Sequence, residues 1–403
     1  MRVRLIDRTL TILAAVILLA IPGSFIVAVL VDDTPGLRDV DRRNCRAFIQ
    51  DNLWPGSTSD YAVWTDDEAQ PVVGRRDLAS GDWEIVELGG LEGNPLDGPV
   101  PDDLHNVWAI AEGPDGRVHV VGNAHATPLR YARTVGDDFT TWEGGELDLV
   151  TERVTYPRFL ASDDELLLVH RDGVSQRSRS LLSVMDADGG WRFRGVIIDA
   201  LPDEDGVYLS RVMVDRATGA LSAFTTWRTE RDNQFSEGIG YIWSTDDGRT
   251  WSAPGGTLGG SADRQLAQVI DEDLVGFVIN HGGATLDLAG EPHMVLRSRD
   301  DRDLIVHVWR DGGTWTHEML ALGLTGRPGM ATGPDGTVWV LGIAGGNLVA
   351  VDARDPDRRI ERAAGLPSNC DVSIDSRSME HDGLVRMLVV DGATPSIVSI
   401  QLP

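Results

Sequence analysis

Lysine is absent from this chain of 403 residues, and cysteine occurs only twice. All 36 basic residues are therefore arginines, against 63 aspartates and glutamates, and the net charge is −27. Two cysteines exclude a disulfide-rich scaffold and a four-cysteine zinc site. The acidic balance disfavours nucleic acid and anionic lipid as partners, because both bind basic surfaces. It also opposes a polyanionic ligand unless the binding region is locally basic.

One long run without charges occupies residues 9–31. As a helix it would be about 34 Å long, enough to cross a bilayer. Arginines precede the run and aspartates follow it, which predicts a cytoplasmic N-terminus and an exported body. We therefore expect a cytoplasmic segment at 1–8, a transmembrane signal anchor at 9–31, a linker at 32–44 and an extracytoplasmic domain at 45–403. The alternative is a cleaved signal peptide, which would release a secreted protein.

The body consists of short alternating apolar runs separated by turns, which is typical of an all-β fold. Residues 111–122 (AEGPDGRVHVVG) and 331–342 (ATGPDGTVWVLG) are near copies of a turn followed by a strand. Weaker copies place seven turns in register, at Glu68, Gly116, Glu165, Gly219, Gly290, Gly336 and Gly383. Their spacing averages about 52 residues, which predicts a seven-bladed β-propeller.

A second repeated element supports the propeller. Residues 244–251 (STDDGRTW) fit the Asp-box pattern S-x-D-x-G-x-T-W at its fixed positions, Ser244, Asp246, Gly248, Thr250 and Trp251. Degenerate relatives end at Trp83, Trp142, Trp191 and Trp315. The aspartate and glycine suit a tight hairpin turn and the aromatic ring suits packing between blades, so we expect a structural role.

Several residues suited to proton transfer or anion binding occupy the positions that line a propeller channel. His105 opens a repeat and His125 follows a strand, whereas we expect His119, His170, His293 and His307, which alternate with apolar residues, to be structural. The further candidates at channel positions are Arg130, Tyr156, Arg171, Tyr208, Arg211 and Arg228. Imidazoles, phenols and guanidiniums together suit proton transfer beside a carboxylate.

The phrases NAHATPLRYAR, VTYPRFLASDDELLLVHRDG and VYLSRVMVDRATGALSAFTTWR, with the Asp box, resemble the BNR-repeat propellers that include ulvan lyases. These lyases cleave beside a uronic acid by β-elimination. The resemblance implies that His125 and Tyr156 transfer protons, that His105 assists, and that Arg171 neutralises the uronate carboxylate. The implied reaction requires neither a metal nor a cofactor. We expect the other candidates, Arg130, Tyr208, Arg211 and Arg228, to contact the substrate.

Three functions are compatible with these features. The first is a lyase acting on a uronate polysaccharide, and the second is a non-catalytic propeller that binds an envelope glycan or a protein. The third is a sialidase-type hydrolase, which would need three arginines, a Tyr–Glu pair and an acidic aspartate. Separately, Cys45 precedes the first repeat and Cys370 begins the last. We expect a disulfide between them that helps to close the ring, because the exported compartment permits oxidation.

Overall fold

The structure is a computed structural model, in which the chain divides into two compact units, Met1–Asp33 and Thr34–Pro403. The described residues all belong to the second unit: 44, 51–91, 96, 103–145, 147 and 151–403, with short gaps at 163–164, 203–204, 216, 230–234, 260–262, 368–369, 376–382 and 393. The expected membrane segment at 9–31 and Cys45 lie outside them. Within the described part, no helix is long and apolar enough to span a membrane.

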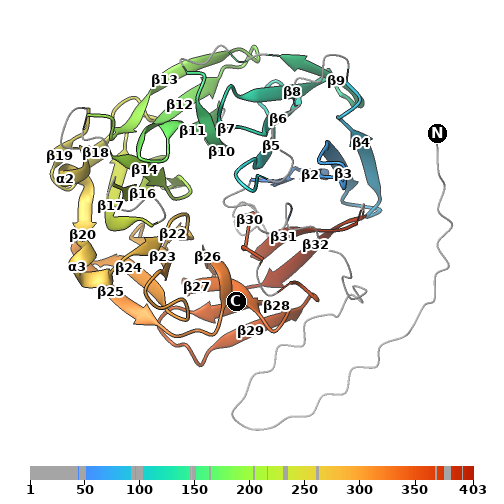
Figure 1. The fold of residues 1–403 in the computed structure, drawn as a ribbon. Coiled ribbons are helices and arrows are strands. Elements are labelled where there is room, and N and C mark those ends of the chain that lie inside the picture. The colour runs from blue at the N-terminus through green and yellow to red at the C-terminus, as the bar shows by residue number, and fades with distance from the viewer. Residues whose placement is uncertain are drawn as a thin grey trace, which may run out of the picture. The chain divides into compact units, whose positions relative to one another are not determined.

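The described residues form seven antiparallel sheets that follow one another around a ring (Figure 1). The first sheet contains β1 (Leu53–Pro55), β2 (Ser59–Thr65), β3 (Pro71–Asp77) and β4 (Trp83–Glu87). The second contains β5 (Trp108–Glu112), β6 (Val118–Gly122), β8 (Arg130–Val135) and β9 (Asp138–Gly145). The third contains β7 (His125–Thr127), β10 (Val154–Ser162), β11 (Glu165–Val174), β12 (Arg177–Met185) and β13 (Trp191–Asp199).

The fourth sheet is the largest and carries two short helices beside it. Its strands are β14 (Gly206–Leu209), β15 (Met213–Val214), β16 (Leu221–Arg228), β17 (Glu237–Ser244), β18 (Ser252–Ala253), β19 (Gly256–Thr257) and β20 (Gln268–Ile270). The helices are α2 (Asp263–Ala267) and α3 (Glu272–Val275). The fifth sheet contains β21 (Val278–Ile279), β22 (Ala284–Leu286), β23 (Pro292–Ser298), β24 (Ile305–Asp311) and β25 (Thr314–Leu320).

The last two sheets bring the chain back to its first sheet. The sixth contains β26 (Thr325–Thr332), β27 (Val338–Ala344), β28 (Asn347–Asp352) and β29 (Arg359–Ala363), and the seventh contains β30 (Ile374–Asp375), β31 (Leu384–Asp391) and β32 (Thr394–Gln401). Six sheets have four or more strands and are full blades, whereas the seventh has three in the described residues. The all-β propeller is therefore confirmed, but the expectation of seven blades is corrected to six, because among the described residues the last repeat contributes only β30 to β32.

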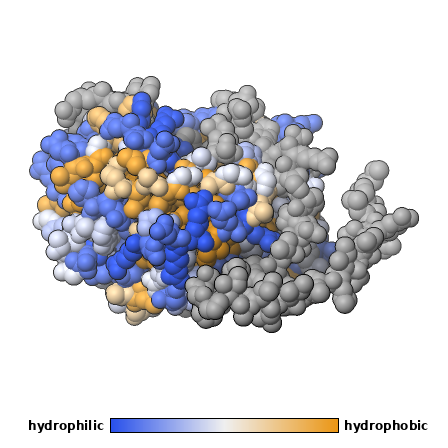
Figure 2. Space-filling model, turned by 90° about the horizontal axis from the view of Figure 1, so that it is seen from below, coloured by the Kyte–Doolittle hydropathy of each residue, from blue (hydrophilic) through white to orange (hydrophobic). Residues whose placement is uncertain are grey.

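Apolar side chains fill the spaces between neighbouring sheets. One cluster joins the third and fourth sheets, and another joins the seventh to the first through Leu388 and Val390 of β31 against Trp64 and Val72. The outer strand β29 alternates between exposed and half-buried residues, as a strand with one solvated face does. Figure 2 shows hydrophilic and hydrophobic residues interspersed over the face seen from below.

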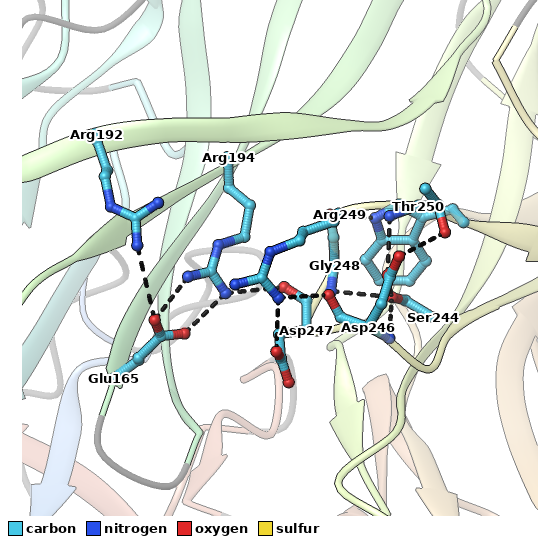
Figure 3. A network of polar contacts seen from close by, with 10 residues as sticks. Glu165, Arg192, Arg194, Ser244, Asp246, Asp247, Gly248, Arg249 and Thr250 are labelled. Atoms are coloured by element: carbon cyan, nitrogen blue, oxygen red, sulfur yellow. Dashed lines mark hydrogen bonds and ion pairs between the residues drawn. The ribbon is translucent and has the colours of Figure 1, made fainter.

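The Asp-box residues form a compact turn between β17 and β18. Asp246 accepts hydrogen bonds from the backbone N–H and the hydroxyl of Thr250, at 2.8 and 2.7 Å, and these bonds lower the pKa of its carboxyl. Gly248 has φ +78°, and a Cβ atom there would lie 2.2 Å from Leu182 of the third sheet. Arg194 of β13 donates to the carbonyl of Asp247, so this turn also fastens two sheets together (Figure 3).

Cys370 forms a disulfide bond. Cys45 is the other cysteine of the sequence, and since it lies outside the described residues, the pairing of the two stays a prediction. Cys370 is fully buried and packs in the cluster between the sixth and seventh sheets. A covalent bond at this point would act where the ring closes.

Candidate active site

Strand register brings three of the predicted catalytic residues to one end of the third sheet. Thr155 of β10 pairs with His125 of β7 on one side and with Arg171 of β11 on the other. Tyr156 follows Thr155 at an irregularity in this register, between Thr155 and Arg158. His105, which precedes β5 in the second sheet, packs against the same group. The four predicted catalytic residues therefore come together from two neighbouring sheets.

The two imidazoles form a stacked pair. The ring centroids of His105 and His125 lie 4.1 Å apart with an interplanar angle of 17°. Asp103 holds both, because its Oδ1 lies 2.6 Å from Nδ1 of His105 and its Oδ2 lies 2.5 Å from Nδ1 of His125. Their side chains are 35% and 36% exposed, so solvent and ligand can reach them.

The surroundings lower the pKa of both Asp103 and His105, but for different reasons. Burial alone would raise the pKa of Asp103, but hydrogen bonds from the His105 backbone and from both imidazoles outweigh it, so that pKa is lowered. The pKa of His105 is also lowered, chiefly by burial, with Asp103 opposing the shift. At neutral pH the cluster therefore contains an ionised Asp103 and a neutral His105.

Tyr156 lies at the centre of the site in an unusual backbone conformation. Its φ is +56°, a left-handed value that costs a non-glycine residue roughly 1–2 kcal/mol and must be held by its surroundings. The ring is 6% exposed and packs edge-on against His281 at 4.4 Å. Its centroid lies 6.1 Å from that of His105. Burial raises the pKa of Tyr156 to about 12, so the phenol keeps its proton at neutral pH.

Two arginines give the site a positive charge. The guanidinium of Arg171 lies over the rings of Tyr156 and Tyr208, at 5.0 and 4.9 Å, and that of Arg228 lies 4.6 Å from the Tyr208 centroid. Nε and Nη1 of Arg171 and Nε of Arg228 are buried and have no hydrogen-bond partner among the described residues. Buried guanidinium groups need compensation, so these nitrogens suit an anionic ligand.

Arg130 and Arg211, two of the four predicted substrate-binding residues, have protein partners. Arg130 donates to the carbonyls of Asn123 and Pro128 and thereby holds the loop that carries His125. Arg211 forms an ion pair with Asp51. It lines a cavity of about 1640 Å³ that extends along β10 from Arg158 to Ser162. Tyr208 and Arg228, in contrast, lie beside Arg171.

Three residues at the site were missed from the sequence. Asp103 lies two positions before His105, and this D-x-H spacing was the available signal. His281 comes from the fifth sheet, in the phrase INHGG, and burial with nearby arginines lowers its pKa well below the usual value. Arg158 is 5% exposed, donates to the carbonyl of Ser210, and has its pKa lowered to about 10 by burial.

The histidines expected to be structural are buried. His119 and His170 are 0% and 1% exposed, and His293 and His307 are each 1% exposed. His119 lies within hydrogen-bond distance of the Tyr131 hydroxyl and of Asp115, at 2.7 and 2.9 Å. His119, His293 and His307 therefore belong to the blades, whereas His170, on β11, lines a small cavity together with Tyr156 and Arg171.

By residue type, Asp103, His105 and His125 could together hold a metal ion, since their ligand atoms lie within 4.8 Å of one another. Two ligands of a tetrahedral zinc ion at about 2.1 Å are roughly 3.4 Å apart. The Nδ1–oxygen separations of 2.6 and 2.5 Å are shorter than that and are those of charge-assisted hydrogen bonds. The arrangement present is therefore a carboxylate shared by two imidazoles.

Solved structures with the same fold include several carbohydrate-active enzymes. Polysaccharide lyase Uly1 is 16% identical with a TM-score of 0.68, and the match covers 94% of each chain. A PL25 ulvan lyase bound to -[GlcA(1-4)Rha3S]- is 14% identical with a TM-score of 0.67, covering 91% of this chain and 94% of that one. An α-L-arabinanase of Penicillium chrysogenum is 14% identical with a TM-score of 0.51, covering 76% and 95%.

No curated protein sequence matches the chain. The model of the family described as "BNR repeat-containing family member" matches residues 59–321. This match spans the first five sheets of the propeller, including the Asp box and the group around Tyr156. The chain therefore belongs to the BNR repeat-containing family.

Proposed function

We propose that this protein is a polysaccharide lyase that cleaves its substrate beside a uronic acid by β-elimination. The observation that carries the proposal is the set of buried guanidinium nitrogens on Arg171 and Arg228 that have no hydrogen-bond partner among the described residues. They lie beside a protonated phenol and an accessible imidazole pair. A net charge of −27 opposes a polyanion, but the site itself is locally basic. The likeness in fold to polysaccharide lyases supports the same reaction class.

In the proposed reaction, Arg171 and Arg228 bind the uronate carboxylate and offset its charge, which makes the adjacent C5 proton more acidic. A neutral imidazole, His125, accepts that proton. The electron pair of the C5–H bond forms the C4=C5 double bond, and the C4–O bond breaks. Tyr156 donates its proton to the departing oxygen, a role that suits a phenol whose pKa is raised to about 12. Solvent then returns the proton from His125 to Tyr156.

The test is the ultraviolet absorbance of the unsaturated uronate product. The purified full chain should generate it from at least one uronate polysaccharide, with a glucuronate–rhamnose polymer included in the panel. Arg171→Ala should lower the rate on the order of 10²-fold or more, because it removes the charge compensation. Arg192→Ala, on the outer strand β13 and with a side chain that is 53% exposed, is the matched control and should leave the rate unchanged.

Other outcomes would favour the other two functions. Glycan binding without any rise in absorbance would identify a non-catalytic propeller. Release of a fluorophore from a sialoside would identify a hydrolase. Arg171→Lys keeps the charge but loses the planar fork, so an intermediate rate for this variant would separate lost compensation from lost folding.

We also propose that the hydrophobic segment at 9–31 anchors the protein in a membrane, with the propeller on the extracytoplasmic side. The support is the length of the uncharged run and the arginines that precede it. Membrane fractionation of cells that produce the full chain tests the anchor. Recovery of a shortened protein in the soluble exported fraction would show a cleaved signal instead.

A further inference from the structure

We propose that Asp103 is the positioning residue of the site. It accepts a hydrogen bond from the Nδ1–H group of both His105 and His125, and this leaves Nε2 of His125 as the proton acceptor. This inference rests on the proposed lyase function for its catalytic consequence. Its structural content, the tautomer of two imidazoles, does not depend on any activity. Asp103 is outside the set of residues that the family resemblance implied.

The contacts define the hydrogen-bonding roles. Asp103 receives three hydrogen bonds, from the backbone N–H of His105 at 2.9 Å and from the two Nδ1 atoms at 2.6 and 2.5 Å. An ionised carboxylate only accepts, so each Nδ1 must carry the hydrogen. A neutral imidazole has a single N–H, and its other nitrogen then holds a lone pair. In their neutral forms, both rings are therefore held as the Nδ1–H tautomer.

The bonding pattern distinguishes the two rings, which are about equally exposed. No described residue forms a hydrogen bond to Nε2 of His125, whose side chain is 36% exposed. His105 is tied to Asp103 twice, through its backbone and through its ring, and it stacks on His125 at 4.1 Å. His105 therefore holds the carboxylate and the neighbouring ring in place, and His125 presents its lone pair to substrate.

The shared carboxylate also limits the charge of the cluster. When His125 accepts the C5 proton, the imidazolium remains 2.5 Å from the negative Asp103 and is compensated by it. A second proton on His105 would place two positive charges about 4 Å apart over a single negative one. The cluster thus cycles between one and no added proton, as a base that accepts one proton per turnover requires.

The test uses Asp103→Asn in the full chain. The two Nδ1 atoms bond to different oxygens of Asp103, and asparagine replaces one of these oxygens by an NH2 group that donates. The proposal therefore expects His125 to gain the Nε2–H tautomer in a part of the molecules. In the wild type, the ¹⁵N NMR spectrum of the histidine-labelled protein should show the Nδ1–H tautomer for both rings, and in the variant it should change for His125. The kcat should fall on the order of 10²- to 10⁴-fold with KM changed less than about threefold.

Asp115→Asn is the matched control. Asp115 bonds to the buried His119 at 2.9 Å, outside the site, so this variant should change the His119 signals and leave kcat unchanged. Asp103→Glu restores the charge and should recover part of kcat, whereas a merely structural loss would not be recovered in this selective way.

Each outcome decides a different point. An Nε2–H tautomer of His125 in the wild-type spectrum would overturn the proposal, whatever the activity. A zinc response would also overturn the proposal. If Zn²⁺ shifted the NMR signals of both rings and raised the melting temperature of the wild type but not of Asp103→Asn, the cluster would be a metal site. The expected spectrum in a protein that cleaves no uronate polysaccharide would support the assignment of Asp103 and reject the lyase function instead.

Discussion

The protein contains two stacked histidine pairs with a carboxylate beside each, and they lie in different surroundings. His105 and His125 share Asp103 and are each about one-third exposed. His293 lies on β23 and His307 on the adjacent β24, with side chains that are 1% exposed. In the second pair Nδ1 of His293 lies 3.1 Å from Nε2 of His307, whose Nδ1 faces Glu318 at 3.1 Å.

The difference teaches how the same side chains become a reactive site or a part of the core. In the exposed pair, both rings give their hydrogen to one carboxylate and the outer nitrogen of His125 stays available. In the buried pair, Nε2 of His307 is used by the neighbouring ring, and burial lowers the pKa of both histidines to about 4. The second pair is therefore neutral and enclosed at physiological pH. Access and bonding pattern separate the two roles, and residue type does not.

The largest expected effect is the loss of activity in His125→Ala. The rate of uronate elimination should fall on the order of 10²- to 10⁴-fold, because the proton acceptor is removed. The free energy of unfolding should change by less than about 1 kcal/mol, since the side chain is only partly buried. Steady-state kinetics and urea unfolding measure the two quantities. Equal activity in the variant and the wild type would show that the exposed pair is no more reactive than the buried one.

The second effect is a loss of stability in His293→Ala. Removing this buried ring leaves a cavity and deprives Nε2 of His307 of its hydrogen-bond partner, so the free energy of unfolding should fall by about 2–4 kcal/mol. The activity of the folded variant should match that of the wild type. His317→Ala, on the neighbouring strand β25 and only half-buried, is the control and should cost much less. A fall in kcat without a fall in the free energy of unfolding would show that His293 acts in the reaction and not in the core.

A third effect is a pH dependence of stability from the buried pair. Each pKa is lowered to about 4 in the folded protein, so between pH 6.5 and 4 the unfolded chain binds more protons and stability decreases as the pH falls. The expected loss from the two histidines together is on the order of 3 kcal/mol between pH 6.5 and 5. Urea unfolding of the wild type and of the double variant His293→Leu/His307→Leu measures it. The double variant should show a flatter profile; an unchanged slope would assign the dependence to other groups.

The smallest effect concerns the carboxylates of the two pairs. Glu318 is 40% exposed, so Glu318→Gln should lower the free energy of unfolding by less than about 1 kcal/mol and leave kcat unchanged. The equivalent change at the other pair, Asp103→Asn, is expected to act on kcat instead. Thermal denaturation and steady-state kinetics on both variants give the comparison, and a large stability loss in Glu318→Gln would show that exposure is a poor guide to its role.

Local pattern was enough to predict the blades but not their number. The predicted turns at Gly116, Gly219, Gly290, Gly336 and Gly383 have glycines with φ between +70° and +83°, because a tight turn is determined by its own few residues. The last sheet lacks a fourth described strand, a feature of the ring that no single repeat encodes. The repeat pattern therefore predicted an all-β propeller correctly and the number of its blades incorrectly.

The candidate site was also predicted only in part. Thr155 lies between His125 and Arg171 through strand register, and the family motifs already pointed to those positions. Asp103 reaches His125 across 22 residues, and His281 enters from the fifth sheet. Such contacts depend on how loops from different sheets meet. The residue spacing within one repeat does not predict these contacts between loops.

The joint between the first and last sheets has a consequence for synthesis of the protein. Arg386 contacts the fully buried Asp60 at 3.4 Å across 326 residues of sequence. On the ribosome the first sheet emerges long before β31, so its apolar face stays uncovered until the end of translation. A chain released before Leu388 and Val390 would expose that face and leave Asp60 without one of its arginines. The first sheet therefore stays prone to aggregation until the last sheet has been synthesised and packs against it.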